Sequence, residues 1–76
     1  MEKNLKDLKP GDRGVVIKAR GRGGAAKRLL DMGLVAGVPV EIIRVAPLGD
    51  PIEICVKGYN LTLRGDEAAG VMVDVD

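Results

Sequence analysis

The amino-acid sequence predicts a small, mainly β fold: an SH3-like barrel of five short strands, with one short helix inserted at about residues 25–32. Three observations predict it. Apolar and polar residues alternate in five short segments, which is typical of antiparallel strands with one wet face. Brief turns separate these segments. With 76 residues, the chain removes its exposed sheet edges most economically by closing into a barrel. An OB-like barrel is the alternative, but it usually needs a longer chain. Residues 1–76 are expected to form a single domain.

The first part of the chain predicts a lead-in, a turn and a strand. Residues 1–7 are polar, and we expect Leu5 and Leu8 to pack against the body of the domain. Proline followed by glycine favours a tight turn over residues 9–12. Residues 14–19 then alternate and predict a half-buried strand. Its two faces carry Val15, Ile17 and Ala19 on one side and Val16 and Lys18 on the other.

A short helix follows the glycine-rich residues 20–24. Residues 25–32 consist mostly of good helix formers, and Gly33 stands where a left-handed C-cap would end the helix. Residues 34–37 lead out through a second turn. The apolar helix positions are Ala26, Leu29, Leu30 and Met32, which leaves Lys27, Arg28 and Asp31 for the solvent side.

The second half predicts the remaining strands from the same alternation. In residues 40–45, Val40 and Ile42 oppose Glu41, Ile43 and Val45. The next strand alternates Ile52, Ile54 and Val56 with Glu53, Cys55 and Lys57. After a turn at residues 58–60, Leu61 and Leu63 alternate with Thr62 and Arg64. We expect Asp66 to cap one helical turn through Ala69, and Val71, Val73 and Val75 to complete the last strand, with Met72 and Asp74 on its other face.

Residues 45–52 form the most informative segment. Pro47 and Pro51 each fix φ and remove a backbone donor, and each pushes the preceding residue toward extended geometry. The segment therefore predicts a stiff corner that presents Leu48 and Asp50. Stiffness without a catalytic residue nearby indicates recognition.

The composition disfavours several classes of function. The net charge is +1, so neither nucleic acid nor an anionic membrane is favoured as a partner. The chain has no histidine and one cysteine, which excludes histidine-based zinc or iron sites, cysteine-rich sites and nucleophilic triads. Asp74 and Asp76 would form at best a weak site for a hard cation. We therefore expect a non-enzymatic protein with no catalytic residue, cofactor or metal.

The sequence leaves open the roles of two residues, Cys55 and Tyr59. Cys55 is by default a semi-exposed structural thiol, and a chain with one cysteine, no signal peptide and no membrane-length apolar stretch fits a reducing cytosol. Tyr59, the one aromatic residue, either caps the barrel with its ring buried and its hydroxyl wet, or anchors an interface.

Residues 21–26 match the dinucleotide fingerprint G-x-G-x-x-A, and Glu41 lies about where the ribose-binding acid is sought. However, Glu41 falls at the start of the next predicted strand, the strands alternate, and the chain is too short for a doubly wound sheet. We interpret this segment as a turn before the helix.

A local basic cluster lies beside the predicted start of the helix: Arg20, Arg22, Lys27 and Arg28. A helix N-terminus beside basic side chains favours an anion, but no aromatic platforms for base stacking accompany them. We interpret the cluster as a solvated loop or a surface that meets an acidic protein. The alternative is a small-barrel nucleic-acid-binding protein that uses the cluster from Arg20 to Arg28.

Several motifs together carry a resemblance. They are Leu29-Leu30-Asp31-Met32-Gly33-Leu34, Ala46-Pro47-Leu48-Gly49-Asp50-Pro51-Ile52, and Gly58-Tyr59 with Leu61-Thr62-Leu63-Arg64 and Glu67-Ala68. With Leu5, Leu8, Pro10 and Gly11 near the start, they resemble the FeoA family of bacterial ferrous iron transport proteins over nearly the whole chain. Any one motif is weak, but together and in this order they are highly specific.

The resemblance implies an SH3-like cytoplasmic domain that works with FeoB, the membrane permease that carries a cytosolic GTP-binding domain. It implies an accessory protein that docks on the permease and modulates its transport or its GTP-binding domain. Recruitment to the inner face of the membrane would come through that partner. A homo-oligomer is compatible with the sequence, but no motif demands one.

Protein recognition is the mechanism that the residues favour. SH3-like barrels ordinarily bind proline-rich peptides on aromatic side chains, and this chain offers Tyr59 alone. The stiff corner and the helix instead predict a preorganised surface, with Leu48 as apolar anchor and charges beside it. The partner-binding candidates are Arg28, Leu48, Asp50, Tyr59 and Arg64. A turn cap at Asp50 and a solvated strand end at Arg64 explain those two residues equally well.

Overall fold

The computed structural model describes residues 1–20 and 24–75, and it contains six strands in one antiparallel sheet. The strand order is β1-β6-β2-β3-β4-β5. The elements are β1 (Glu2–Asn4), the 3-10 turn η1 (Leu5–Asp7), β2 (Arg13–Ala19), α1 (Ala25–Asp31), β3 (Pro39–Val45), β4 (Ile52–Val56), β5 (Tyr59–Leu63), α2 (Gly65–Ala68) and β6 (Val71–Val75). The mainly β fold class is confirmed. The expected polar lead-in is a sixth strand, because residues 2–4 pair with β6.

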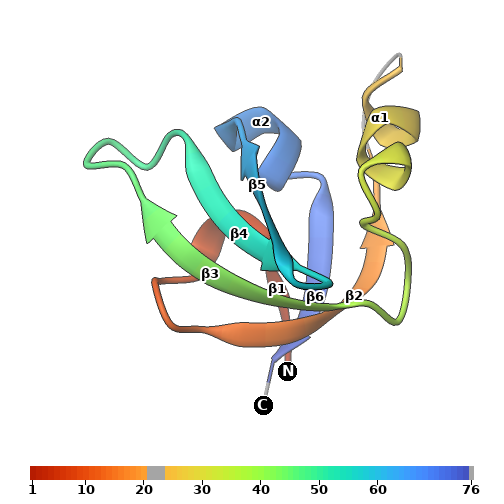
Figure 1. Cartoon of the computed structure of the whole chain (residues 1–76), viewed down its shortest axis with the longest axis horizontal. Helices are drawn as coiled ribbons and strands as arrows, with labels where there is room; N and C mark the ends of the chain where they lie inside the picture. Colours follow the sequence, from red (N-terminus) through yellow and green to blue (C-terminus); the bar gives the residue numbers. More distant parts are fainter. Residues whose placement is uncertain (21–23, 76) are drawn as a thin grey trace.

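The sheet curls around one apolar core. Figure 1 shows the curled sheet with α2 across its upper opening and α1 beside it. Leu5 and Leu8 are buried, as predicted from the sequence. The core also contains Val16, Leu29, Leu34, Val38, Val40, Ile42, Ile52, Ile54, Val56, Leu63, Ala68, Val71 and Val73. No helix in the described part of the chain is long and apolar enough to cross a membrane.

Two register shifts change the predicted faces of β2 and β3. The pairing of β2 with β6 shifts between Val16 and Lys18, so that Val16 and then Ala19 pack toward the core. The prediction that Val15 and Ala19 share a face is therefore wrong. In β3 the shift falls between residues 42 and 44, and Val45 packs on the core although the alternation predicts it on the face opposite Ile42. An extra residue in one strand moves every following side chain to the other face.

The inserted helix α1 contacts the barrel through a narrow stripe. Leu29 is fully buried, whereas Leu30 is 46% exposed, so the predicted apolar position at Leu30 is wrong. Leu30 follows Leu29 directly, and adjacent residues do not share a face in a helix. Gly33 has a φ of +96° and follows the helix as the expected left-handed residue.

The turns place the ends of β2, β4 and β5. The first turn is confirmed: Gly11 has a φ of +91°, and the Asp12 N–H donates to the Lys9 carbonyl (2.9 Å). The turn predicted at residues 58–60 instead consists of Lys57 and Gly58, both with positive φ. Tyr59 and Asn60 belong to β5, because two consecutive residues of positive φ close a two-residue hairpin.

The helical turn near the end of the chain is present, but Asp66 does not cap it. Arg64 occupies the N-cap position, and α2 begins at Gly65. The Arg64 N–H donates to Glu67 Oε1 (3.0 Å), which is the reciprocal bond of a capping box. The acid at the third helical position therefore stabilises this turn.

Candidate protein-docking surface

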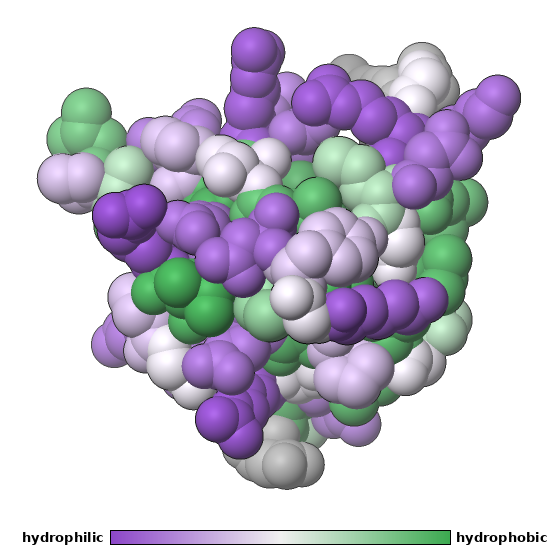
Figure 2. Space-filling model, in the orientation of Figure 1, coloured by the Kyte–Doolittle hydropathy of each residue, from purple (hydrophilic) through white to green (hydrophobic). Residues whose placement is uncertain are grey.

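The β3–β4 corner, residues 46–51, is closed by two backbone hydrogen bonds. The Gly49 N–H donates to the Ala46 carbonyl (2.8 Å), and the Ala46 N–H donates to the Pro51 carbonyl (3.1 Å). Gly49 has a φ of +83°, and the Asp50–Pro51 peptide bond is cis. Leu48 lies at the tip and is 95% exposed, and Figure 2 shows apolar atoms projecting there. The corner thus presents a large apolar side chain to solvent.

Asp50 lies where the corner meets α2. A Cβ atom on Gly65, the first residue of α2, would lie 3.3 Å from Asp50 Oδ2. Glycine at this position therefore lets the corner approach the helix closely. Within residues 1–20 and 24–75, no group donates a hydrogen bond to the Asp50 carboxylate. The carboxylate is exposed and accessible to a partner.

Arg28 and Arg64 meet at Glu67, which is not among the partner-binding candidates predicted from the sequence. Glu67 is 7% exposed. Its Oε1 accepts the Arg64 N–H (3.0 Å), and its Oε2 lies 3.1 Å from Arg28 Nη1. One buried carboxylate therefore ties α1 to the start of α2. The signal in the sequence was an acid three residues after Arg64, the residue at the N-cap, which is the spacing of a capping box.

Tyr59 holds the end of α1 against β5. Its hydroxyl donates to the Met32 carbonyl (2.7 Å), and its side chain is 45% exposed. A Cβ atom on Gly33 would lie 2.9 Å from the same hydroxyl. The alternative with a buried ring and a wet hydroxyl is wrong, because the residue is half-exposed and the hydroxyl bonds to backbone. The alternative that Tyr59 anchors an interface stays a prediction.

Four of the five candidates lie at one end of the barrel. The corner, α2 and α1 occupy the upper end in Figure 1, and the Asp50–Gly65 and Arg28–Glu67 contacts connect them. We call the residues Arg28, Leu48, Asp50, Arg64 and Glu67 the corner surface. Tyr59 lies at the opposite end of β5 from Arg64 and is not part of it.

A hollow of about 320 Å³ adjoins the corner. It is lined by Arg44, Ala46, Pro47, Pro51, Glu53 and Thr62. Glu53 accepts hydrogen bonds from Arg44 Nη2 (2.9 Å) and from Asn60 Nδ2 (2.9 Å) and forms the polar side of the hollow. Two proline rings and Ala46 beside the Arg44–Glu53 ion pair suit an apolar side chain with a polar flank.

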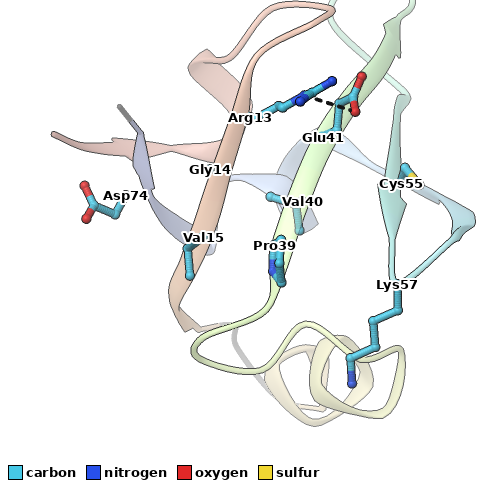
Figure 3. Close-up of a pocket in the computed structure, with 9 residues that line it drawn as sticks. All are labelled: Arg13, Gly14, Val15, Pro39, Val40, Glu41, Cys55, Lys57 and Asp74. Carbon is cyan, nitrogen blue, oxygen red and sulfur yellow. Dashed lines mark ion pairs between the residues drawn. The ribbon is translucent and has the colours of Figure 1, made fainter.

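A larger groove of about 630 Å³ lies on the outer face of the sheet. Figure 3 shows it between β2 and β3, with Cys55 and Lys57 on one side and Asp74 on the other. Arg13 Nε lies 3.3 Å from Glu41 Oε1 across one end. Cys55 is half-buried in this groove, as expected for a structural thiol. No described residues form a group of three or more potential metal ligands.

The structure describes three of the four residues of the basic cluster, namely Arg20, Lys27 and Arg28. Arg22 and the glycines at 21 and 23 lie outside the described residues, and with them most of the dinucleotide fingerprint. Lys27 and Arg28 are exposed, but the Arg28 guanidinium is paired with Glu67. This ion pair lowers the positive charge that Arg28 offers to a phosphate.

A model of the FeoA domain matches residues 3–75. The chain belongs to the FeoA family. It is similar to a fusion protein of the Fe(2+) transport protein A and the Fe(2+) transporter FeoB from Porphyromonas gingivalis, with 38% identity over 71 residues. The match covers 93% of this chain and 8% of that protein. The family is thus associated with ferrous iron transport, and in one relative it is joined to FeoB.

Solved structures of FeoA proteins share the fold. The FeoA protein of Chlorobium tepidum superposes with a TM-score of 0.87 at 42% identity, covering 96% of this chain and 70% of that one. FeoA of Stenotrophomonas maltophilia, described as a prokaryotic SH3 domain protein and complexed with zinc, gives a TM-score of 0.81 at 29% identity over 97% of this chain and 89% of that one. The predicted FeoA resemblance and SH3-like fold are both confirmed.

Proposed function

We propose that this protein is a non-enzymatic accessory subunit that docks on the cytosolic part of a FeoB permease and modulates its ferrous iron transport or its GTP-binding domain. The fusion in Porphyromonas gingivalis supports the partner, because an FeoA-like segment and FeoB share one chain there. Fusion gives two domains a high effective concentration for each other. Docking on the cytosolic face would place the protein in the cytoplasm.

The corner surface is the proposed contact. Leu48 projects 95% exposed from a corner held by two backbone hydrogen bonds, and a large apolar side chain presented so fully is a candidate anchor for a partner's pocket. Asp50 and Arg64 are both exposed near the start of α2, where Arg64 is the N-cap residue and Asp50 lies beside Gly65. A rigid presentation reduces the entropy lost on binding. The exposure of Leu48 is the single observation that carries this surface.

Calorimetric titration of the protein against the GTP-binding domain of the FeoB from the same organism tests the proposal. We expect saturable binding that Leu48→Asp weakens by at least about 2 kcal/mol, which is typical of a buried anchor. Val35→Asp is the matched control, because Val35 is 38% exposed on the α1–β3 connection, away from the corner in Figure 1. Equal loss in both variants, or no loss in Leu48→Asp, contradicts the corner surface.

A further inference from the structure

Gly65 begins α2 at a position where the backbone does not require glycine. It is a buried residue of the helix, and it is not one of the glycines of positive φ in the described part of the chain. Glycine is a poorer helix former than alanine. The conformation of α2 therefore does not explain why residue 65 is glycine.

The side chain of Asp50 is what a side chain at position 65 would meet. A Cβ atom on Gly65 would lie 3.3 Å from Asp50 Oδ2, 3.6 Å from its Cγ and 3.8 Å from its Cβ. The two shortest distances are to the carboxylate group, so a Cβ atom would crowd the carboxylate more than the backbone of the corner. Glycine at position 65 leaves the space beside this carboxylate open.

The backbone of the corner limits where the Asp50 side chain can lie. Two backbone hydrogen bonds close the corner, and Pro51 restricts the backbone of the residue before it. With the backbone held, the side chain is limited to staggered χ1 rotamers. The rotamer in the structure places the carboxylate against Gly65. A Cβ atom at position 65 would disfavour that rotamer.

The Asp50 carboxylate is available to a group outside the chain. Asp50 is exposed, and within residues 1–20 and 24–75 it takes part in no ion pair. Arg64, the neighbour of Gly65, is exposed as well but is not paired with Asp50. An ionised carboxylate only accepts hydrogen bonds, and its strongest partners are cationic donors.

We infer that Gly65 is a positioning residue for docking: it keeps the Asp50 carboxylate in one rotamer, on the same corner as Leu48, where it binds a lysine or arginine side chain of the partner. This inference rests on the proposed docking of the corner surface. A side chain that is ordered before binding loses less entropy on binding, and a charge near an apolar anchor contributes specificity. Alanine at position 65 should therefore suit the helix and impair docking.

The χ1 rotamer of Asp50 can be measured by NMR in the whole protein without FeoB. Three-bond couplings from the backbone nitrogen and carbonyl carbon of Asp50 to its Cγ should show one dominant rotamer in the wild type. Gly65→Ala should shift or average these couplings without lowering the melting temperature, because the carboxylate can turn away from the new Cβ. Gly24→Ala is the matched control, since a Cβ atom there would meet no described atom within 4 Å.

Three results of this measurement would overturn the inference. They are an averaged Asp50 rotamer in the wild type, unchanged couplings in Gly65→Ala, and a Gly65→Ala variant that melts lower or does not fold. In the last case the fold itself would require the glycine. The Gly24→Ala control should leave the Asp50 couplings as in the wild type.

Calorimetric titration against the GTP-binding domain of FeoB tests the effect on docking. Gly65→Ala should raise the dissociation constant roughly threefold. It should have no further effect once Asp50 is alanine, because only the 3.8 Å contact with the Asp50 Cβ then remains. No weakening by Gly65→Ala, or the same weakening in the Asp50→Ala background, overturns the inference. If the wild type does not bind, the proposed docking fails, and the couplings decide separately whether Gly65 positions Asp50.

Discussion

Replacing Glu67 by alanine removes the carboxylate that joins α1 to α2. Three losses follow from the structure. The Arg64 N–H loses its 3.0 Å acceptor, which for a helix cap costs about 1 kcal/mol. The buried stem of the side chain leaves unfilled space, which costs about 1 kcal/mol. The ion pair with Arg28 adds at most about 0.5 kcal/mol, because the Arg28 side chain is 62% exposed. The sum is about 2 to 3 kcal/mol.

Urea and thermal unfolding followed by circular dichroism measure this loss. For a domain of this size, about 2 to 3 kcal/mol lowers the melting temperature by roughly 10 to 20 °C. Glu67→Gln keeps the acceptor and the stem, so we expect it to lose less than about 1 kcal/mol. Arg28→Met should cost less than about 0.5 kcal/mol, and it should cost nothing further once Glu67 is glutamine.

The comparison of the two Glu67 variants can refute the reasoning. If Glu67→Ala costs less than about 1 kcal/mol, the cap and the packing contribute little. If Glu67→Gln costs as much as Glu67→Ala, the charge on the carboxylate is the main contribution. The cap and the packing would then contribute less than the ion pair, contrary to the magnitudes derived from the structure.

Two further predictions concern the contacts around β5. Gly33→Ala should destabilise the fold by about 1 to 2 kcal/mol, because φ is +96° and the new Cβ would lie 2.9 Å from the Tyr59 hydroxyl. The cost in urea unfolding should fall when Tyr59→Phe removes that hydroxyl, and an unchanged cost contradicts the steric explanation. Lys57→Asn should stabilise the fold by about 0.5 kcal/mol in the same assay, because asparagine before glycine suits the two positive-φ positions of this turn. A loss of stability there would contradict the turn assignment.

The fold was predictable because its signals are local. Ile52, Ile54 and Val56 alternate without interruption, and all three are buried. Gly11 and Gly33 stand where left-handed backbone is required. The faces of β2 and β3 were not predictable, because a bulge depends on how the neighbouring strand fits and leaves no clear mark in the alternation.

The candidate site was predictable in part for the same reason. The corner follows from Pro47 and Pro51, whose effect on the backbone is local. The role of Glu67 depends on its ion pair with Arg28 of α1, which lies 3.1 Å away although residues 28 and 67 are 39 positions apart in the sequence. The Tyr59 contact with Met32 spans 27 residues. Contacts between distant segments of this kind require the tertiary structure.

Binding to FeoB tests the central claim most directly. Calorimetric titration against the GTP-binding domain of FeoB from the same organism should be carried out without nucleotide and with bound GDP or a GTP analogue. The proposal predicts saturable binding that depends on the nucleotide and that Leu48→Asp weakens. Absence of binding in every nucleotide state would contradict docking on this domain, and the membrane-embedded part of the permease would then be the next partner to test.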